Sequence, residues 1–259
     1  MKTTTRMGNM IQDVLTMFKR CMLMTVRNID ALFTGIAQPA LLMFLFVYVF
    51  GGAMNVGNID YVNYIVPGVI LQCIGQCAGI TAISVNNDLK KGIIDRFRSL
   101  PIAKSSVLIG HALAAVVRNV ITTVLIIIVA LLIGFRPTAN LIQWLAAMGI
   151  LFLYILAITW LSIIFGLISS SAESAQGLTI VCILLPYISS GFVTTETMPA
   201  ALRIFAENQP LTPIIESVRA LLLNTSPDGK ILISVIWCLG ILFISYIIAV
   251  QLYKHKLSK

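Results

Sequence analysis

Long apolar stretches alternate along the chain with shorter segments that carry charges. The apolar stretches cover about residues 31–50, 65–85, 106–135, 141–169, 176–193 and 231–253. Each of them reaches or approaches the roughly 20 residues that a helix needs to cross about 30 Å of hydrocarbon. The pattern predicts an all-α polytopic membrane protein, with six transmembrane helices in one domain over residues 31–259.

Residues 1–30 precede the first apolar stretch and show a different periodicity. Ile11, Leu15 and Met22 fall on one face at helical spacing, while Arg20 and Arg27 fall on the opposite face. An amphipathic helix of this kind lies in the plane of a membrane surface. The segment is therefore predicted to be an interfacial elbow helix on the cytoplasmic side.

The longest segment between apolar stretches precedes the last one and contains two short helical patterns. They cover residues 199–208 and 211–223, and Pro210 separates them. Both are apolar enough to dip into the outer leaflet. They predict a pair of short re-entrant or interfacial helices on the external face.

A charged segment at residues 86–106 lies between the second and third apolar stretches. Leu89, Ile93 and Phe97 share one helical face there, charged residues share another, and Pro101 follows. Proline removes a backbone donor and restricts the preceding residue, so it ends the helix. The segment predicts a short amphipathic helix, which is either a plain inner loop or a surface that docks into a partner's cleft.

Composition and charge support a membrane protein with both termini in the cytoplasm. The chain is 58% hydrophobic and 11% charged, with a mean hydropathy of +0.96, which excludes a soluble domain. Fourteen of the 18 Lys and Arg residues lie in residues 1–30, 88–118 and 254–259. Positive residues concentrate on the cytoplasmic side of membrane proteins. The same distribution accounts for the net charge of +8, so we expect the lipid bilayer and no nucleic acid as a partner.

Three polar side chains within the apolar stretches have two possible roles. Gln72 and Gln76 accompany the Gly75 and Gly79 pair, whose GxxxG spacing favours close helix packing with amide hydrogen bonds. Lining a substrate path is the alternative role for both glutamines. Arg118 lies about 18 Å along a helix from Ser106, so it is either embedded or reaches the cytoplasmic interface by snorkelling, and we expect snorkelling.

Several kinds of chemistry have no support in the sequence. A G-x-x-x-x-G-K-[ST] phosphate loop is absent, and the middles of the apolar stretches contain no carboxylate. Only two histidines occur, so a histidine metal site is not expected. The chain is therefore predicted to have no catalytic residues, no metal and no cofactor of its own, so that any ATP would be bound by another chain.

Two stretches of sequence resemble a known family. "GIIDRFRSLPIAKSSVLIGHALAAVVRN" is similar to the segment that follows the second span of ABC-2 type exporter permeases. "GFVTTETMPAALRIFAENQPLTPIIESVRALLL" resembles the family's signature before its last span, including Met198, Pro199 and Arg219. It departs from that signature at Thr194 and Thr195, where a proline is common, and at Gln209. Among subgroups the chain looks most similar to daunorubicin-resistance-like drug exporter permeases.

The resemblance implies partners, a location and a set of contact residues. It implies a multi-pass protein of the bacterial plasma membrane that pairs with a second permease copy and two ATPase subunits, which bind ATP and Mg. It also implies that the charged segment is the ATPase-coupling helix, with contacts from Lys90, Lys91, Ile94, Asp95, Arg96, Phe97 and Arg98. Hydrophobic drug-like or lipid-like substrates would be exported. A polysaccharide or lipid-linked glycan exporter and a non-transporting scaffold are the alternatives.

Overall fold

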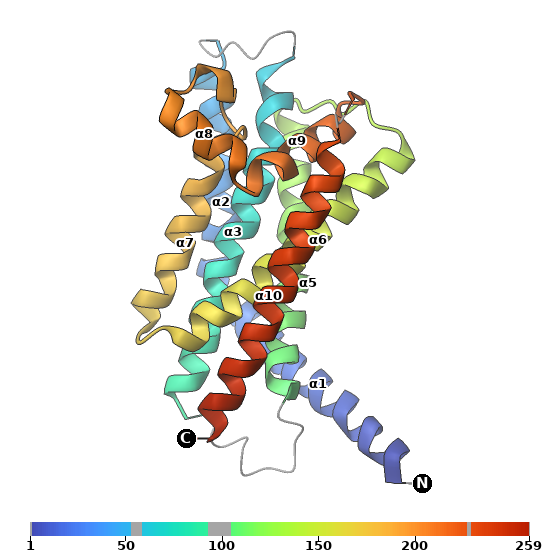
Figure 1. Ribbon diagram of the computed structural model, residues 1–259, viewed down its shortest axis with the longest axis vertical. Helices are drawn as coiled ribbons and strands as arrows, with labels where there is room; N and C mark the ends of the chain where they lie inside the picture. The colour runs from blue at the N-terminus through green and yellow to red at the C-terminus, as the bar shows by residue number, and fades with distance from the viewer. Residues whose placement is uncertain (1, 53–58, 93–104, 227–228, 259) are drawn as a thin grey trace.

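The protein is a bundle of helices with both chain ends at the same end of the bundle (Figure 1). The computed structural model describes residues 2–52, 59–92, 105–226 and 229–258. Within those ranges every regular element is a helix and no strand occurs. The described part of the chain is thus all-helical, as predicted. The end with the two termini is called the lower end below, and the opposite end the upper end, as in Figure 1.

Five helical segments of the described chain are long and apolar enough to cross a membrane. They are α2 (Ile29–Leu45) with its π-helical continuation η1 (Phe46–Phe50), α3 (Tyr61–Lys90), α5 (Ser105–Ile133), α6 (Leu141–Ile168) and α10 (Lys230–Ser258). Their bounds lie within about five residues of the predicted spans. These five helices confirm a multi-pass membrane protein.

The predicted fifth span corresponds to α7 (Ala172–Tyr187), which is shorter and begins earlier than expected. A capping box starts the helix, because the Ser171 side chain accepts from the Ser174 backbone and the Ser174 side chain accepts in return. The helix ends at Tyr187, and turns follow it. With 16 residues, α7 falls short of the usual spanning length, so the layout of six spans remains a prediction.

The N-terminal segment forms α1 (Lys2–Arg27), and the backbone is non-helical only at Asn28 before α2 begins. Met17 and Cys21 are buried, and α1 packs mainly against α5. Ile11 and Leu15 are 57% and 56% exposed, so an apolar face of the helix has no cover within the described chain. This face is what an interfacial helix requires, although its position at a membrane surface remains a prediction.

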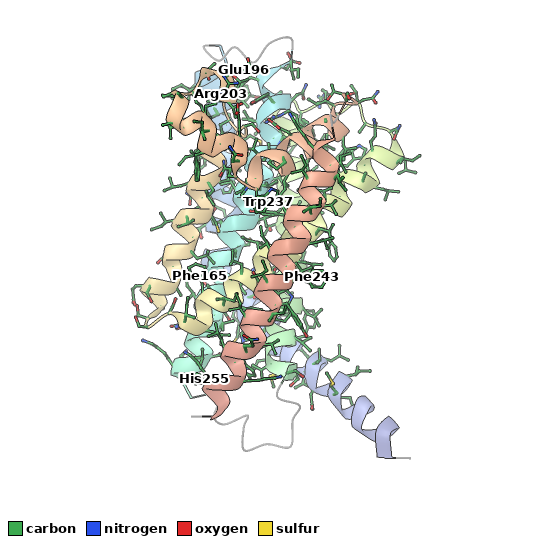
Figure 2. All side chains as sticks on the ribbon, viewed as in Figure 1. Phe165, Glu196, Arg203, Trp237, Phe243 and His255 are labelled. Carbon is green, nitrogen blue, oxygen red and sulfur yellow. The ribbon has the colours of Figure 1, made fainter. Side chains whose placement is uncertain are left out.

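Two short helices, α8 (Ala200–Asn208) and α9 (Leu211–Leu222), form the upper end. They match the two predicted patterns, but their surroundings differ. Ile214, Ile215 and Val218 of α9 are fully buried against the other helices, whereas α8 is largely exposed. Figure 2 shows Glu196 and Arg203 at this upper end and His255 at the lower end, with the exposed Trp237 and Phe243 of α10 between them.

Helix α3 is the centre of the bundle and packs closely along α7. A Cβ added to Gly68 would lie 2.7 Å from the Gly191 oxygen, and one added to Gly75 would lie 2.8 Å from Cys182 Cβ. A Cβ at Gly79 would overlap the side chain of Thr179. The small residues of α3 therefore allow the close helix approach that GxxxG spacing predicts.

Candidate functional site

A buried carboxylate at the lower end of α3 joins three helices. Asp88 is 1% exposed and receives two hydrogen bonds from Arg20 of α1, at 2.5 and 2.9 Å. The Nε2 atom of His111 in α5 lies 3.0 Å from the same carboxylate, and Cys21 Sγ lies 3.7 Å from His111 Nδ1. Hydrogen bonding to Asp88 raises the pKa of Arg20 above its ordinary value. We call Arg20, Asp88 and His111 the lower ion cluster.

This cluster was not evident from the sequence pattern, because Asp88 lies in the charged segment at residues 86–106 and Arg20 lies on the charged face of the N-terminal helix. Helix α3 continues to Lys90, which brings Asp88 inside the bundle. A signal was present, since His111 lies in the first half of an apolar stretch. A buried ionisable residue requires a partner, and Asp88 lies near the end of the preceding helix at the same end of the bundle.

Arg118 lies further inside, on the same side of the bundle. Its Nη2 atom donates to Thr81 Oγ1 at 2.5 Å and to the Cys77 carbonyl at 3.4 Å, and its Nη1 atom donates to Thr25 Oγ1 at 3.3 Å. The residue is 5% exposed, so the expectation that it snorkels to the interface is wrong. The threonines and the carbonyl offer acceptors inside the protein, which removes the need to reach water. The Nε atom has no hydrogen-bond partner among the described residues.

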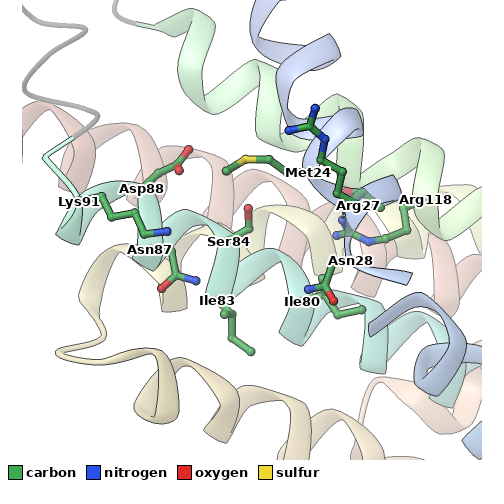
Figure 3. A pocket seen from close by; sticks show the side chains of 11 residues that line it. Met24, Arg27, Asn28, Ile80, Ile83, Ser84, Asn87, Asp88, Lys91 and Arg118 are labelled. Atoms are coloured by element: carbon green, nitrogen blue, oxygen red, sulfur yellow. Dashed lines mark hydrogen bonds between the residues drawn. The ribbon is translucent and has the colours of Figure 1, made fainter. Parts of the chain in front are cut away.

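A cavity of about 440 Å³ lies beside Arg118 and the lower ion cluster. Figure 3 shows Ile80, Ile83, Ser84 and Asn87 of α3 lining one side, with Asp88 and Lys91 at the end of that helix. Residues from the junction of α1 and α2 line the other side. They include Met24, Thr25, Arg27 and Asn28. The cavity therefore combines apolar walls with three cationic side chains.

Most of the predicted coupling helix lies outside the described residues. This applies to Ile94, Asp95, Arg96, Phe97 and Arg98, so the role of these residues remains a prediction. Lys90 and Lys91 are described, are exposed, and close the lower end of α3 directly beyond Asp88. The lower ion cluster thus sits where the chain enters the predicted coupling segment.

The two predicted glutamines face different neighbours. Gln72 is fully buried and donates to the Tyr187 hydroxyl of α7 at 3.0 Å. Gln76 donates to Gln38 of α2 at 2.8 Å. Arg118 is the only one of the three predicted path residues that lines the large cavity. The structure therefore does not bring the three together at one site, and their part in a substrate path remains a prediction.

The signature arginine, Arg219 of α9, is buried at the upper end. Its Nε atom donates to the Tyr64 carbonyl at 3.0 Å, and its Nη2 atom donates to the Ser190 carbonyl at 2.6 Å. The guanidinium also lies 3.7 Å from the centre of the Tyr64 ring. Burial lowers the pKa of Arg219. This side chain links α9 to α3 and to the turn after α7.

Comparison with known proteins adds a family match and several relatives. The family model described as ABC-2 type transporter matches residues 12–223. The chain is similar to the daunorubicin resistance ABC transporter permease protein DrrB1 of Streptomyces coeruleorubidus, with 27% identity over 85% of this chain and 78% of the relative. It is also similar to a doxorubicin resistance ABC transporter permease protein, DrrC, of Mycobacterium tuberculosis, with 23% identity over 89% of this chain and 84% of the relative. A transport permease of Cyanophora paradoxa is 26% identical over 83% of this chain and 76% of the relative.

Proposed function

The chain belongs to the ABC-2 type transporter family, and from this membership we propose that it is the transmembrane permease subunit of an ATP-driven exporter. The family match over residues 12–223 is the observation that carries the proposal. The drug-resistance relatives and the apolar helices agree with a membrane permease. In this proposal a separate ATPase subunit, present in two copies, hydrolyses ATP, and a second permease copy completes the complex.

The proposed topology has six spans with both termini in the cytoplasm of a bacterial cell. It treats α7 as the fifth span, because α7 runs beside α3 between the two ends of the bundle (Figure 1). The lower end then faces the cytoplasm, which agrees with its excess of Lys and Arg. The elbow helix α1 lies along the inner surface, and α8 and α9 lie on the external side.

Topology is testable through the exposed Lys91 at the lower end. The five native cysteines are all buried, so a K91C variant adds a thiol that a membrane-impermeant maleimide can reach from one side only. We expect labelling in inverted vesicles and none in sealed right-side-out membranes. A cysteine at the exposed Glu196 should show the reverse pattern. Labelling of K91C from the outside would overturn the proposed orientation.

Coupling to the ATPase is proposed to occur through residues 90–98. The lower ion cluster supports this role, because it fastens the end of α3 to α1 and α5 directly before that segment. A displacement of the segment by the ATPase would therefore be passed to three helices together. Such a rigid connection is one way in which ATP hydrolysis can shift a dimer between inward and outward access.

The test of coupling uses Asp95→Lys and Phe97→Ala. Each change removes one proposed docking contact, and a loss of about 1.4 kcal/mol in binding is a tenfold change in the equilibrium. We expect ATP-dependent transport in vesicles to fall roughly tenfold while the amount of folded permease is unchanged. Lys256→Asp is the matched control, since it changes a charge on the same proposed side outside the segment. Normal transport by both docking variants would contradict the coupling role.

The proposed substrates are hydrophobic drug-like or lipid-like molecules. The names of the relatives connect those proteins with daunorubicin and doxorubicin resistance. A cavity with apolar walls and a few polar groups is typical of sites for molecules of this size. Export of a polysaccharide or lipid-linked glycan is the second candidate, because the same family membership is compatible with it. ATP-dependent uptake of a labelled drug and of a labelled glycolipid into inverted vesicles would separate the two.

A further inference from the structure

The lower cavity contains a buried cation that has no carboxylate partner in the described chain. Arg118 is 5% exposed, lines the cavity, and forms hydrogen bonds only with two threonine hydroxyls and one backbone carbonyl. No carboxylate forms an ion pair with it in the described ranges. Its Nε atom has no acceptor there. A buried charge without a counterion is costly, so this site favours a ligand that brings a negative charge.

The nearby Asp88 does not meet this need. One of its oxygens accepts from both Arg20 and His111, and the other accepts from Arg20. The carboxylate is thus occupied by the lower ion cluster. Arg27 and Lys91 line the same cavity and add two further positive charges. The electrostatic character of the cavity is therefore cationic.

The remaining walls indicate what the anion is attached to. Met24, Ile80 and Ile83 supply apolar surface, and Ser84 and Asn87 supply a few neutral polar groups. The volume of about 440 Å³ falls within the range of small-molecule sites. A charged headgroup fits beside Arg118, and a hydrocarbon chain fits along the apolar residues. This is the pattern of a site for an amphiphile.

We propose that the cavity formed by the α1–α2 junction, α3 and Arg118 binds a phosphate-bearing anionic amphiphile, with its phosphate at Arg118 and with Arg27 and Lys91 adding positive charge elsewhere on the cavity wall. Arginine is well suited to phosphate because its planar, weakly hydrated guanidinium donates several hydrogen bonds. For an exported molecule, the site restricts the substrate class of the proposed exporter to phosphate-bearing amphiphiles. Only the transport experiment below rests on that proposed function. The two sources of such a molecule are an exported substrate and a resident phospholipid of the inner leaflet.

Binding is tested on the purified full chain in a nonionic detergent. Native mass spectrometry compares retention of phosphatidylglycerol with that of phosphatidylcholine of the same acyl chains. We expect the wild type to prefer the anionic lipid by roughly tenfold, which is the worth of one charge-assisted hydrogen bond. Arg118→Gln should remove that preference, whereas Arg118→Lys, which keeps the charge, should retain part of it.

Variants at exposed residues of the cavity separate a loss of lipid binding from a folding defect. Arg118 supports Thr81 and Cys77, so its loss could disturb the bundle. Arg27→Gln with Lys91→Gln changes two exposed residues that line the same cavity, and should weaken the preference several-fold. Arg136→Gln, at an exposed arginine of the upper end, is the matched control and should change nothing. Equal retention of both lipids by the wild type, or a preference that all cavity variants keep, would overturn the inference.

A second experiment identifies the source of the amphiphile. Vesicles that contain the permease and its ATPase receive fluorescent phosphatidylglycerol in the cytoplasmic leaflet, and a membrane-impermeant quencher reports its arrival in the other leaflet. ATP-dependent movement supports the binding site and assigns the amphiphile as substrate. Binding without movement supports the site and assigns a resident lipid. Failure of all ATP-dependent transport would count against the proposed function, and the binding experiment would be unaffected.

Discussion

Two arginines are buried at different levels of the bundle, and they are stabilised in different ways. At the upper end, Arg219 is bound by two backbone carbonyls and by the Tyr64 ring, and it fastens neighbouring segments together. Near the middle of α5, Arg118 is bound mainly by hydroxyl groups and borders a cavity of about 440 Å³. The same type of side chain can therefore join packed segments at one level of the bundle and border a charged cavity at another.

The neighbouring contacts show the same difference. Upper contacts are made by backbone against backbone, as where Gly68 meets Gly191, and by neutral hydrogen bonds such as the one from Tyr61 to the Phe192 carbonyl. Lower contacts are made by the Arg20–Asp88 ion pair, with His111 hydrogen-bonded to the same carboxylate. Backbone contacts fix one geometry, whereas ion pairs respond to a change in charge. The upper end also has ion pairs, Arg203–Glu207 and Lys230–Glu216, but these are partly exposed, whereas Asp88 at the lower end is buried.

The largest expected effect is at the lower ion cluster. Asp88→Asn leaves Arg20 and the buried His111 without their carboxylate, and breaking a buried ion pair in this way costs about 3 kcal/mol of unfolding free energy. The measurement is the denaturant midpoint of the purified protein in detergent. Glu207→Gln, which breaks the exposed pair with Arg203, is the control and should change the midpoint little. Similar midpoints for both variants would remove the contrast between buried and exposed ion pairs.

The next effect is expected at the close contact of the upper end. Gly68→Ala places a Cβ 2.7 Å from the Gly191 oxygen, and because backbone atoms cannot rotate away, we expect a loss of about 2 kcal/mol. Gly149→Ala in α6 is the matched control, since a Cβ there meets nothing within 4 Å. That change should be neutral or stabilise the protein by up to about 1 kcal/mol, because alanine favours helix. Equal thermal midpoints for the two variants would show that the contact tolerates a methyl group.

The smallest effect sharpens the comparison between the two arginines. Arg219→Lys keeps the charge but cannot reach both carbonyls and cover the Tyr64 ring, so we expect a loss of about 1.5 kcal/mol. Arg203→Lys, on the exposed α8, should leave the thermal midpoint unchanged. If Arg219→Lys is as stable as the wild type, charge alone is sufficient at that position. The explanation by hydrogen bonds to two carbonyls and contact with the Tyr64 ring would then be wrong.

The sequence predicted the helices well where the apolar pattern was long and its ends were marked. Residues 141–169 were expected as a span and form α6, which starts at a capping box between Asn140 and Gln143. The prediction for the fifth apolar stretch, residues 176–193, was less accurate. Helix α7 starts at the Ser171 cap, which apolar periodicity does not reveal. Local hydropathy identifies a helix more reliably than it identifies the residue at which that helix begins.

The site was less predictable, since it depends on which helices become neighbours. Arg118 was singled out from its position in an apolar stretch, but its partners Thr25 and Thr81 are 93 and 37 residues away. The Asp88 cluster required knowledge that α1 packs beside α5. The coupling residues 94–98 were proposed from resemblance and from their pattern, and they lie outside the described chain. Long-range packing was thus the missing information.

The break at Asn28 separates the N-terminal helix from the helix that follows it in the chain. Helix α1 rests on α5 and is tied by Arg20 to Asp88 of α3, whereas its backbone link to α2 passes through a single non-helical residue. Helix α1 is therefore attached through its side chains to α3 and α5, and only its backbone leads on to α2.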